Sequence, residues 1–258
     1  MRTLDEHVTA VEQYLAQLSL APELAGLADP MRYALEGGGK RIRPVLCLAT
    51  GEAAGAEPDA LLPAAAAIEL VHNFSLVHDD LPALDDDAVR RGRASTHVAF
   101  GEAVAILAGD ALLAQALELA LSYPQTAVAR ELVHATLGMI GGQYLDVTDG
   151  EGELARLHAL KTGRLFAASV GSALWVAEVS EAQQGAWRAF ADDFGLLFQI
   201  VDDVLDGDGF VLERGADGAR ALAAQTEDRA RARLAEIPAD TSRLDELVSG
   251  LSTRVGAS

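Results

Sequence analysis

Cysteine and lysine are nearly absent from this sequence of 258 residues. The single cysteine, Cys47, excludes an internal disulfide and fits a reducing compartment, so we expect a cytoplasmic protein. Positive charge is also scarce, and the net charge of -19 argues against nucleic acid and anionic membrane surfaces as partners. The N-terminal stretch contains Asp5, Glu6 and Glu12, which a signal peptide would lack. No apolar run approaches membrane-spanning length, so we expect no stable membrane insertion.

Patterns typical of β-strands are missing as well. Alanine, leucine, glutamate and arginine dominate, and no stretch alternates between apolar and polar residues, which predicts an all-α fold. Without a linker segment, we expect a single domain over residues 1–258. Several helices are more apolar than a surface helix needs to be, which predicts a bundle with covered central helices. The predicted helices span residues 4–18, 29–35, 44–53, 58–81, 99–121, 126–148, 155–178, 181–205, 219–236 and 240–251.

Aspartate is concentrated in two short clusters, each directly after a segment that predicts a buried helix. In the first, HNFSLVHDDLPALDDD, five aspartates fall between residues 79 and 87. A continuous helix would place Asp79 and Asp85 about 240° apart around its axis. Pro82 lies between them and disfavours helical geometry at the preceding residue. We therefore expect the helix to end or bulge near Pro82, so that Asp85 folds back towards Asp79.

The second cluster lies in the segment FQIVDDVLD, residues 198–206. An unbroken helix would aim Asp202, Asp203 and Asp206 in one general direction. Buried negative charge is unfavourable unless a cation neutralises it. Carboxylates at an open site suit Mg²⁺, whose remaining positions take water and substrate phosphate, so the two clusters predict a diphosphate site. The alternative is a solvated acidic surface, since 39 acidic residues outnumber 20 basic ones.

Basic residues gather in three short motifs. GGGKRIRP (residues 37–44) is a glycine-rich loop entering a helix, where backbone amides and cationic side chains can hold phosphate. RRGR (residues 90–93) follows the first aspartate cluster and offers charge for a second phosphate group. KTG (residues 161–163) lies between apolar stretches, so its lysine requires an anionic partner. The alternatives are a flexible turn for the glycines and a simple balance of the acidic loop for the arginines.

Together these motifs resemble the trans-polyprenyl diphosphate synthase family, in the bacterial short-chain branch that includes farnesyl diphosphate synthases. The resemblance extends from about residue 33 to residue 206, in the family's order. It rests on GGGKRIRP, ELVHNFSLVHDDLPALDDD, RRG, AGDALL at 108–113, Met139 with GQYLD at 142–146, KTG and FQIVDDVLD. It implies an isoprenoid synthase type I fold, a helical bundle around a deep central cavity with the aspartate motifs facing each other across its mouth. It also implies a homodimer.

The resemblance further implies roles for individual residues. Its isopentenyl diphosphate site would be formed by Gly39, Lys40, Arg43, His72 and Arg91. Arg90 and Lys161 would contact the allylic diphosphate, while Thr162 and Gln199 would line the reacting carbon. The Mg²⁺ ligands, for three ions with diphosphate bound and with Mn²⁺ as an alternative, would be Asp79, Asp80, Asp85, Asp202 and Asp206. The catalytic residues would be Asp79, Asp80, Asp85, Lys161, Thr162, Gln199 and Asp202.

The implied reaction is the Mg²⁺-dependent condensation of isopentenyl diphosphate with C5 and C10 allylic diphosphates to a short trans-prenyl diphosphate. Phe74 lies about 7.5 Å before Asp79 along the helix, where it would form a floor to the cavity. In the family that this sequence resembles, an aromatic residue here, together with the two extra residues inside the first motif, goes with a C15 product, so the resemblance implies farnesyl diphosphate. Ser75 is the second chain-length position. The alternatives are a geranylgeranyl or geranyl product, and an ordinary core position for Phe74. A terpene cyclase shares the aspartate clusters but has no need for GGGKRIRP.

One departure from the family follows the second cluster. Relatives have a loop with GKxxGxD there, whereas in this sequence residues 207–215 lead soon into the helix near residue 219. No lysine follows Lys161, and Arg214 is the only cation of this segment. We expect Arg214 to replace the missing lysine at the cavity mouth. The alternatives are a solvent-facing arginine and, for the whole chain, a low-activity partner subunit of a heteromeric synthase.

Overall fold

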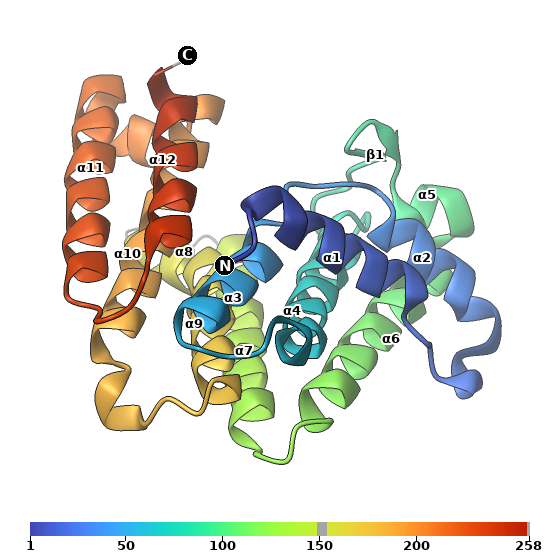
Figure 1. Cartoon of the computed structure of the whole chain (residues 1–258). Coiled ribbons are helices and arrows are strands. Elements are labelled where there is room, and N and C mark those ends of the chain that lie inside the picture. The colour runs from blue at the N-terminus through green and yellow to red at the C-terminus, as the bar shows by residue number, and fades with distance from the viewer. Residues whose placement is uncertain (149–153, 257–258) are drawn as a thin grey trace.

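The computed structural model describes residues 1–148 and 154–256, and this part of the chain is almost entirely helical, as the sequence predicts (Figure 1). The long helices are α1 (Leu4–Gln17), α3 (Ile42–Ala53), α4 (Pro58–Asp79), α6 (Glu102–Leu121), α7 (Ala127–Val147), α9 (Arg164–Val176), α10 (Gly185–Asp206), α11 (Phe210–Ala235) and α12 (Ser242–Gly256). The shorter helices are η1 (Pro22–Leu27), α2 (Ala28–Leu35), α5 (Thr96–Phe100), α8 (Leu154–His158), the π-helix η2 (Ala159–Gly163) and η3 (Glu181–Gln183). Strands β1 (Val89–Arg90) and β2 (Arg93–Ala94) form one small antiparallel hairpin.

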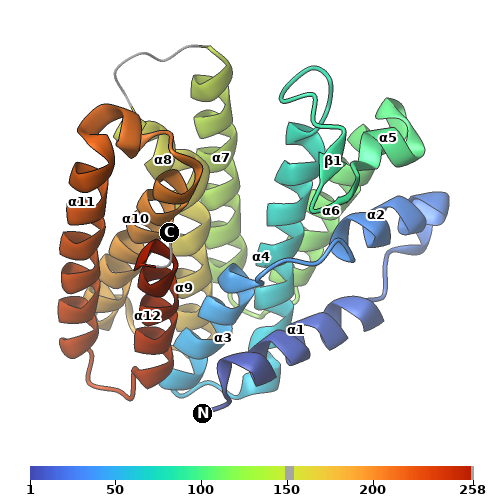
Figure 2. The same ribbon diagram turned by 90° about the horizontal axis from the view of Figure 1, so that it is seen from above.

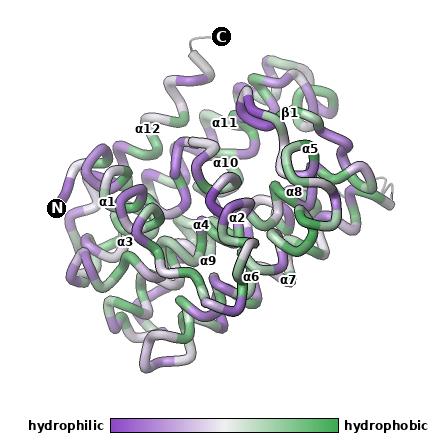
Figure 3. Tube along the Cα trace, turned by 90° about the vertical axis from the view of Figure 1, so that its right-hand side faces the viewer, coloured by the Kyte–Doolittle hydropathy of each residue, from purple (hydrophilic) through white to green (hydrophobic). Residues whose placement is uncertain are grey.

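Helix α4 is the centre of the bundle. Figure 2 shows α11 and α12 on one side of the molecule and α1, α2 and α5 on the other, with α4, α7 and α9 between them. α4 packs against α3, α6 and α9, and it is buried on nearly all sides from Ala64 to Val71. Hydrophobic residues predominate along α4 and α9 at the centre of Figure 3. An apolar sequence on every face is what a central helix of this kind requires.

Helix α10 joins the C-terminal helices to the rest of the bundle. Its buried residues Trp187, Phe190, Phe194, Leu197 and Val201 recur at the three- and four-residue spacing of one helical face. They belong to a hydrophobic cluster shared with α9, α11 and α12. Burial of this face fixes the rotation of α10 about its axis. The direction of the second aspartate cluster is therefore set by the core.

Several boundaries differ from the predicted helices. The predicted helix 99–121 divides into α5 and α6 at Gly101, whose φ is 87°. The predicted helix 155–178 divides into α8, the π-helix η2 and α9, so that the KTG motif lies in a widened turn. The segment expected as a loop before residue 219 is helical from Phe210, because a buried carboxylate accepts a hydrogen bond from the Phe210 amide. The kink of α11 at Gly215 is the remaining irregularity there.

Two helices correct the expectation about membrane-spanning length. By length and composition alone, α4 and α6 are each long and apolar enough to cross a bilayer. In α4, 67% of the apolar window is buried within the protein, which is typical of a core helix. In α6 that share is 44%, and Ile106, Leu107 and Leu121 are exposed. The outer face of α6 is therefore an apolar surface that the described chain leaves uncovered.

Candidate active site

A cavity of about 410 Å³ lies between α4, α7, α9 and η2, and it has a charged end and an apolar body. The charged and polar lining residues are Arg43, His72, Ser75, His78, Asp79, Gln143, Lys161 and Thr162. The apolar body includes Phe74, Leu84, Met139, Ile140 and Leu165. Such a cavity suits a ligand with an anionic head and a hydrocarbon tail.

The first aspartate cluster folds as the sequence predicts. α4 ends at Asp79, and the amide of Asp85 donates a hydrogen bond to the Asp79 carbonyl over 2.9 Å, which brings Asp85 back to the helix end. Burial raises the pKa of the Asp79 carboxyl to about 6, and Asp85 adds to this rise while Lys161 opposes it. The Asp79 carboxylate is therefore a negative charge that the protein does not fully neutralise.

Asp80 is oriented differently from Asp79. Its side chain is buried, and its Oδ1 accepts a hydrogen bond of 2.8 Å from Nε of Arg90. This pairing raises the pKa of the Arg90 guanidinium. Arg90, the first residue of the RRGR motif, is thus held against the first cluster by Asp80. The structure gives Asp80 a role in orienting Arg90, beside the metal ligation that the resemblance implies.

The second aspartate cluster separates into two parts. Asp202 lies partly exposed, and burial together with the negative charge of Asp206 raises the pKa of its carboxyl. Asp203 is buried and bonds to Gln199 and to the amide of Phe210, so the expectation that all three carboxylates point one way is wrong for Asp203. Arg254 of α12 lies 3.8 Å from Asp202.

The donor set fits a divalent cation that binds together with an anionic ligand. Among the residues that the structure describes, no group of three Asp, Glu, His or Cys side chains is already arranged to hold a metal ion. Burial nevertheless raises the pKa of both Asp79 and Asp202, so each cluster holds negative charge that a cation would stabilise. Hard oxygen donors of this kind suit Mg²⁺, with the oxygens of a diphosphate filling the other positions.

Arg43 is a buried cation that forms no ion pair with the residues that the structure describes, although the charges of Glu69 and Asp202 favour its protonated form. Burial lowers the pKa of its guanidinium to about 10, and its Nε has no hydrogen-bond partner. Its Cζ lies 4.5 Å from the ring centre of Phe166 and 5.5 Å from that of Phe198. His72 lines the same end of the cavity, and burial together with Arg43 lowers the pKa of its imidazole, so it is neutral. An anion bound at this end of the cavity would stabilise the buried guanidinium further.

The glycine-rich loop and the RRGR hairpin meet beside this arginine. Nη1 of Arg91 donates a hydrogen bond to the Gly38 carbonyl. A Cβ at Gly39 would lie 2.8 Å from Arg91 Nη1, and the φ of Gly39 is 140°, so only glycine fits there. Burial and the charge of Arg254 lower the pKa of Lys40, and the charge of Asp202 opposes this shift. Lys40 therefore lies towards the second aspartate cluster.

Arg41, in the same motif, has a structural role. Its Nη1 donates to Glu69 over 2.6 Å, and both side chains are buried.

The KTG motif in η2 connects the cavity to α7 and α10. Lys161 Nζ lies 2.5 Å from Asp146, which is the anionic partner that the sequence requires. A Cβ at Gly142 would lie 2.5 Å from the amide nitrogen of Lys161, so Gly142 permits the close approach of α7. Thr162 lines the cavity and donates to Gln199 over 2.7 Å. Gln199 itself lies on a neighbouring cavity of about 430 Å³ behind η2.

Sequence reasoning missed two residues at the site and misplaced a third. Arg254 was missed because no local pattern links the last helix to Asp202. Gln143 was missed although it lies in the GQYLD pattern; both polar atoms of its side-chain amide are buried in the cavity wall and have no hydrogen-bond partner in the described part of the chain. The expectation for Arg214 is not met, because it lies within α11, pairs with Glu213 at 3.2 Å and is not a lining residue of the cavity.

Comparisons with known proteins agree with this geometry. Residues 25–213 match the polyprenyl synthetase family. The chain is 43% identical to a geranylgeranyl diphosphate synthase of Cyanophora paradoxa over 69% of its length, and this match spans 64% of the relative's length. It is 41% identical to a farnesyl diphosphate synthase of Geobacillus stearothermophilus, over 78% of this chain and 72% of the relative. The crystal structure of a geranyltransferase from Legionella pneumophila superposes with a TM-score of 0.88 and 35% sequence identity. The superposition covers 98% of this chain and 96% of that protein, which confirms the expected fold.

Arg43 and Arg41 give a matched pair of variants. Arg43→Met removes a buried charge whose desolvation outweighs its attraction to Glu69 and Asp202, so the ligand-free protein should keep or gain stability in a denaturant titration. Arg41→Met leaves Glu69 buried without its cation and should lower the free energy of unfolding by about 3–5 kcal/mol. For Arg43→Met, calorimetry should show the Kd for inorganic diphosphate with Mg²⁺ rising about tenfold or more. Equal destabilisation by the two substitutions would mean that Arg43 is structural.

Proposed function

The chain belongs to the polyprenyl synthetase family, and from this membership we propose that it is a trans-prenyltransferase that joins isopentenyl diphosphate to an allylic diphosphate. The observation that best supports the proposal is the charge arrangement at the cavity. Arg43 is a buried cation that forms no ion pair with the described residues, and Asp79 is a partly buried carboxylate whose charge Lys161 and Arg90 offset only in part. Diphosphate and divalent cations together would neutralise both.

The cationic residues divide into two groups that suit two diphosphates. Lys40, Arg43, Arg91 and the neutral His72, with the Gly39 backbone, would bind isopentenyl diphosphate. Arg90 and Lys161 would bind the allylic diphosphate, and their carboxylate partners already hold them in place over 2.8 Å and 2.5 Å. The use of two diphosphate sites favours prenyl transfer over a cyclase that takes one substrate.

The chemistry follows from these contacts. Mg²⁺ held by Asp79, Asp80, Asp85, Asp202 and Asp206 would supply positive charge to the leaving diphosphate. Arg90 and Lys161 stabilise the same charge as the bond between C1 and oxygen breaks and its electron pair leaves with the diphosphate. The double bond of isopentenyl diphosphate then attacks C1, and the product loses a proton to the departed diphosphate. The apolar cavity excludes water, which would otherwise trap the allylic cation.

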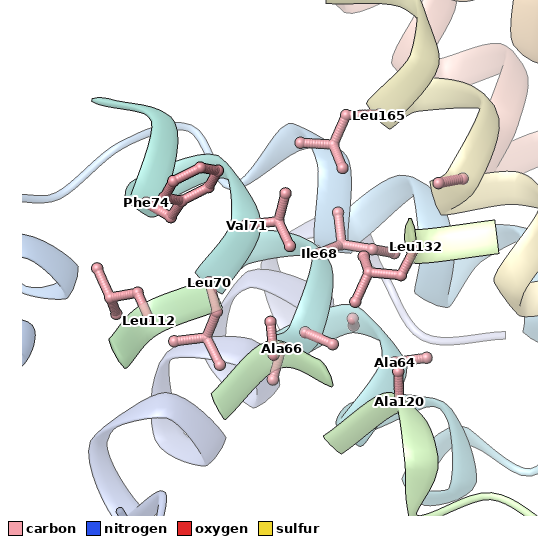
Figure 4. Close-up of a cluster of buried hydrophobic side chains, with 14 of the residues drawn as sticks. Ala64, Ala66, Ile68, Leu70, Val71, Phe74, Leu112, Ala120, Leu132 and Leu165 are labelled. Atoms are coloured by element: carbon pink, nitrogen blue, oxygen red, sulfur yellow. The ribbon is translucent and has the colours of Figure 1, made fainter. Parts of the chain in front are cut away.

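Phe74 supports farnesyl diphosphate as the main product. It lies at the end of the row of buried α4 side chains that runs from Ala64 through Ile68 and Val71 (Figure 4). It also lines the cavity, as Ser75 does, and its ring meets His78 edge-on at 5.0 Å. A growing tail that enters the apolar body would therefore meet this ring. The names of the relatives include both farnesyl and geranylgeranyl synthases, so a C20 product is the alternative.

A homodimer is supported by the outer faces of α6 and α7. The exposed apolar residues on α7 recur every three or four positions and are Val133, Leu137, Ile140, Tyr144 and Val147. The last three also line the cavity, so a second copy seated on this stripe and on α6 would complete the cavity wall. Sedimentation at micromolar concentration should show a dimer, and a monomer there would contradict this part of the proposal.

Two aspartates test the proposed reaction. Asp79→Asn and Asp202→Asn should each lower kcat/KM for prenyl transfer by about 10² or more, because each removes charge that stabilises the ionising substrate. Asp86→Asn is the matched control from the same loop. Asp86 is exposed with a φ of 53°, which asparagine also tolerates, so its effect should stay below about threefold. Near-normal rates for both Asp79→Asn and Asp202→Asn would refute the site.

Product length tests the role of Phe74. Phe74→Ala should shift the product from C15 to C20 and longer, since the removed ring lets the tail extend further. Val77→Ala, a buried change on the same helix away from the cavity, should leave the length unchanged. Mass spectrometry of the dephosphorylated products gives the answer even though Phe74→Ala also lowers stability. Unchanged length would assign the floor to another residue and leave Phe74 a core position.

A further inference from the structure

Asp203 belongs to the second aspartate cluster but is turned away from it. Its side chain is 3% exposed, whereas that of its neighbour Asp202 is 44% exposed. Residues next to each other on a helix lie about 100° apart, so burial of one face of α10 sends the two carboxylates in different directions. The inward position of the Asp203 carboxylate therefore has a cause other than the one that places Asp202 at the solvent-facing cluster.

Both oxygens of Asp203 are occupied by protein donors. Oδ1 accepts a hydrogen bond of 2.7 Å from Nε2 of Gln199. Oδ2 accepts one of 2.9 Å from the amide of Phe210, the first residue of α11, and lies 3.5 Å from Nε2 of His158. The backbone leaves room for this carboxylate only because residue 209 is glycine, where a Cβ would lie 2.1 Å from Oδ2. The site is thus built around Asp203.

The chain of hydrogen bonds continues to the cavity. Oε1 of Gln199 accepts a hydrogen bond of 2.7 Å from the hydroxyl of Thr162, and Thr162 lines the cavity beside Asp79 and Lys161. A carboxylate can only accept, so the amide group of Gln199 must turn its NH₂ towards Asp203. Its carbonyl oxygen then faces Thr162 and accepts a hydrogen bond from the hydroxyl group. The lone pairs of Thr162 Oγ1 are left for the cavity.

We propose that Asp203 is a positioning residue that, through Gln199, fixes the direction of the Thr162 hydroxyl so that oxygen lone pairs face the reacting carbon. This inference rests on the proposed prenyl transfer, in which positive charge develops at that carbon. A fixed oxygen dipole stabilises this charge without reorganising during the reaction. Without the carboxylate, the Gln199 amide can rotate, and the Thr162 hydroxyl can then turn its proton towards the cation.

Kinetics of Asp203→Asn test the proposal, with Asp193→Asn as the control. Asp193 lies on the same helix and pairs with Arg229 at 2.9 Å, away from the cavity. Asp203→Asn should lower kcat with isopentenyl and geranyl diphosphates about 10- to 100-fold. Both KM values, and the Kd for inorganic diphosphate with Mg²⁺ from calorimetry, should stay within about threefold. Asp193→Asn should leave kcat and KM unchanged.

A double-variant cycle separates this role from a structural one. Thr162→Val removes the hydroxyl at constant shape, so Asp203→Asn should change kcat by less than about twofold in the Thr162→Val background. If the kcat losses of Asp203→Asn and Thr162→Val instead multiplied in the double variant, the proposal would be overturned, because Asp203 would then act independently of the Thr162 hydroxyl. Diphosphate binding weakened tenfold or more by Asp203→Asn would also overturn it and make Asp203 a metal ligand.

The same cycle measured by urea unfolding does not depend on turnover. If the wild type lacks prenyl transfer, the proposed function fails, but the hydrogen-bond chain can still be judged. Non-additive shifts of the urea midpoint for Asp203→Asn and Thr162→Val would support the chain of hydrogen bonds. Additive shifts would refute it.

Discussion

Buried charge that the protein neutralises only in part, held in the wall of an apolar cavity, is the constraint on which this structure depends. Arg43 lies over the rings of Phe166 and Phe198 and forms no ion pair with the described residues, and Asp79 ends the central helix with its pKa raised to about 6. Each charge is unfavourable alone. The tightly packed core around α4 and α10 keeps both in place, and a diphosphate bound with divalent cations would neutralise them together. Both charges would therefore favour binding of a diphosphate with divalent cations.

The parts of the site that depend on local rules follow from the sequence. Pro82 ends the helix near Asp79, and Asp85 folds back to it as expected. The glycine-rich loop enters a helix as expected, since α3 begins at Ile42. The apolar character of α4 predicts a covered central helix, and α4 is one. Each of these features involves one residue type and its immediate neighbours, so one sequence is enough to predict it.

The remaining parts depend on contacts between distant segments. Rotation of α10 decides that Asp203 faces inward, and the Asp203 carboxylate in turn starts α11 at Phe210, well before the predicted residue 219. Arg254 reaches Asp202 from the last helix, whereas Arg214, the cation nearest in sequence, pairs with Glu213. The exposed apolar face of α6 also results from how the helices surround it. Propensity and spacing contain no information on such pairings.

The central claim is that this cavity takes two diphosphate substrates and joins them. The most direct measurement incubates the purified protein with Mg²⁺, isopentenyl diphosphate and each of the C5, C10 and C15 allylic diphosphates, and reads product length by mass. The account predicts a C15 product from the C5 and C10 substrates, formed only when Mg²⁺ and isopentenyl diphosphate are both present. Absence of transfer with all three, or a product formed from an allylic diphosphate alone, would contradict it.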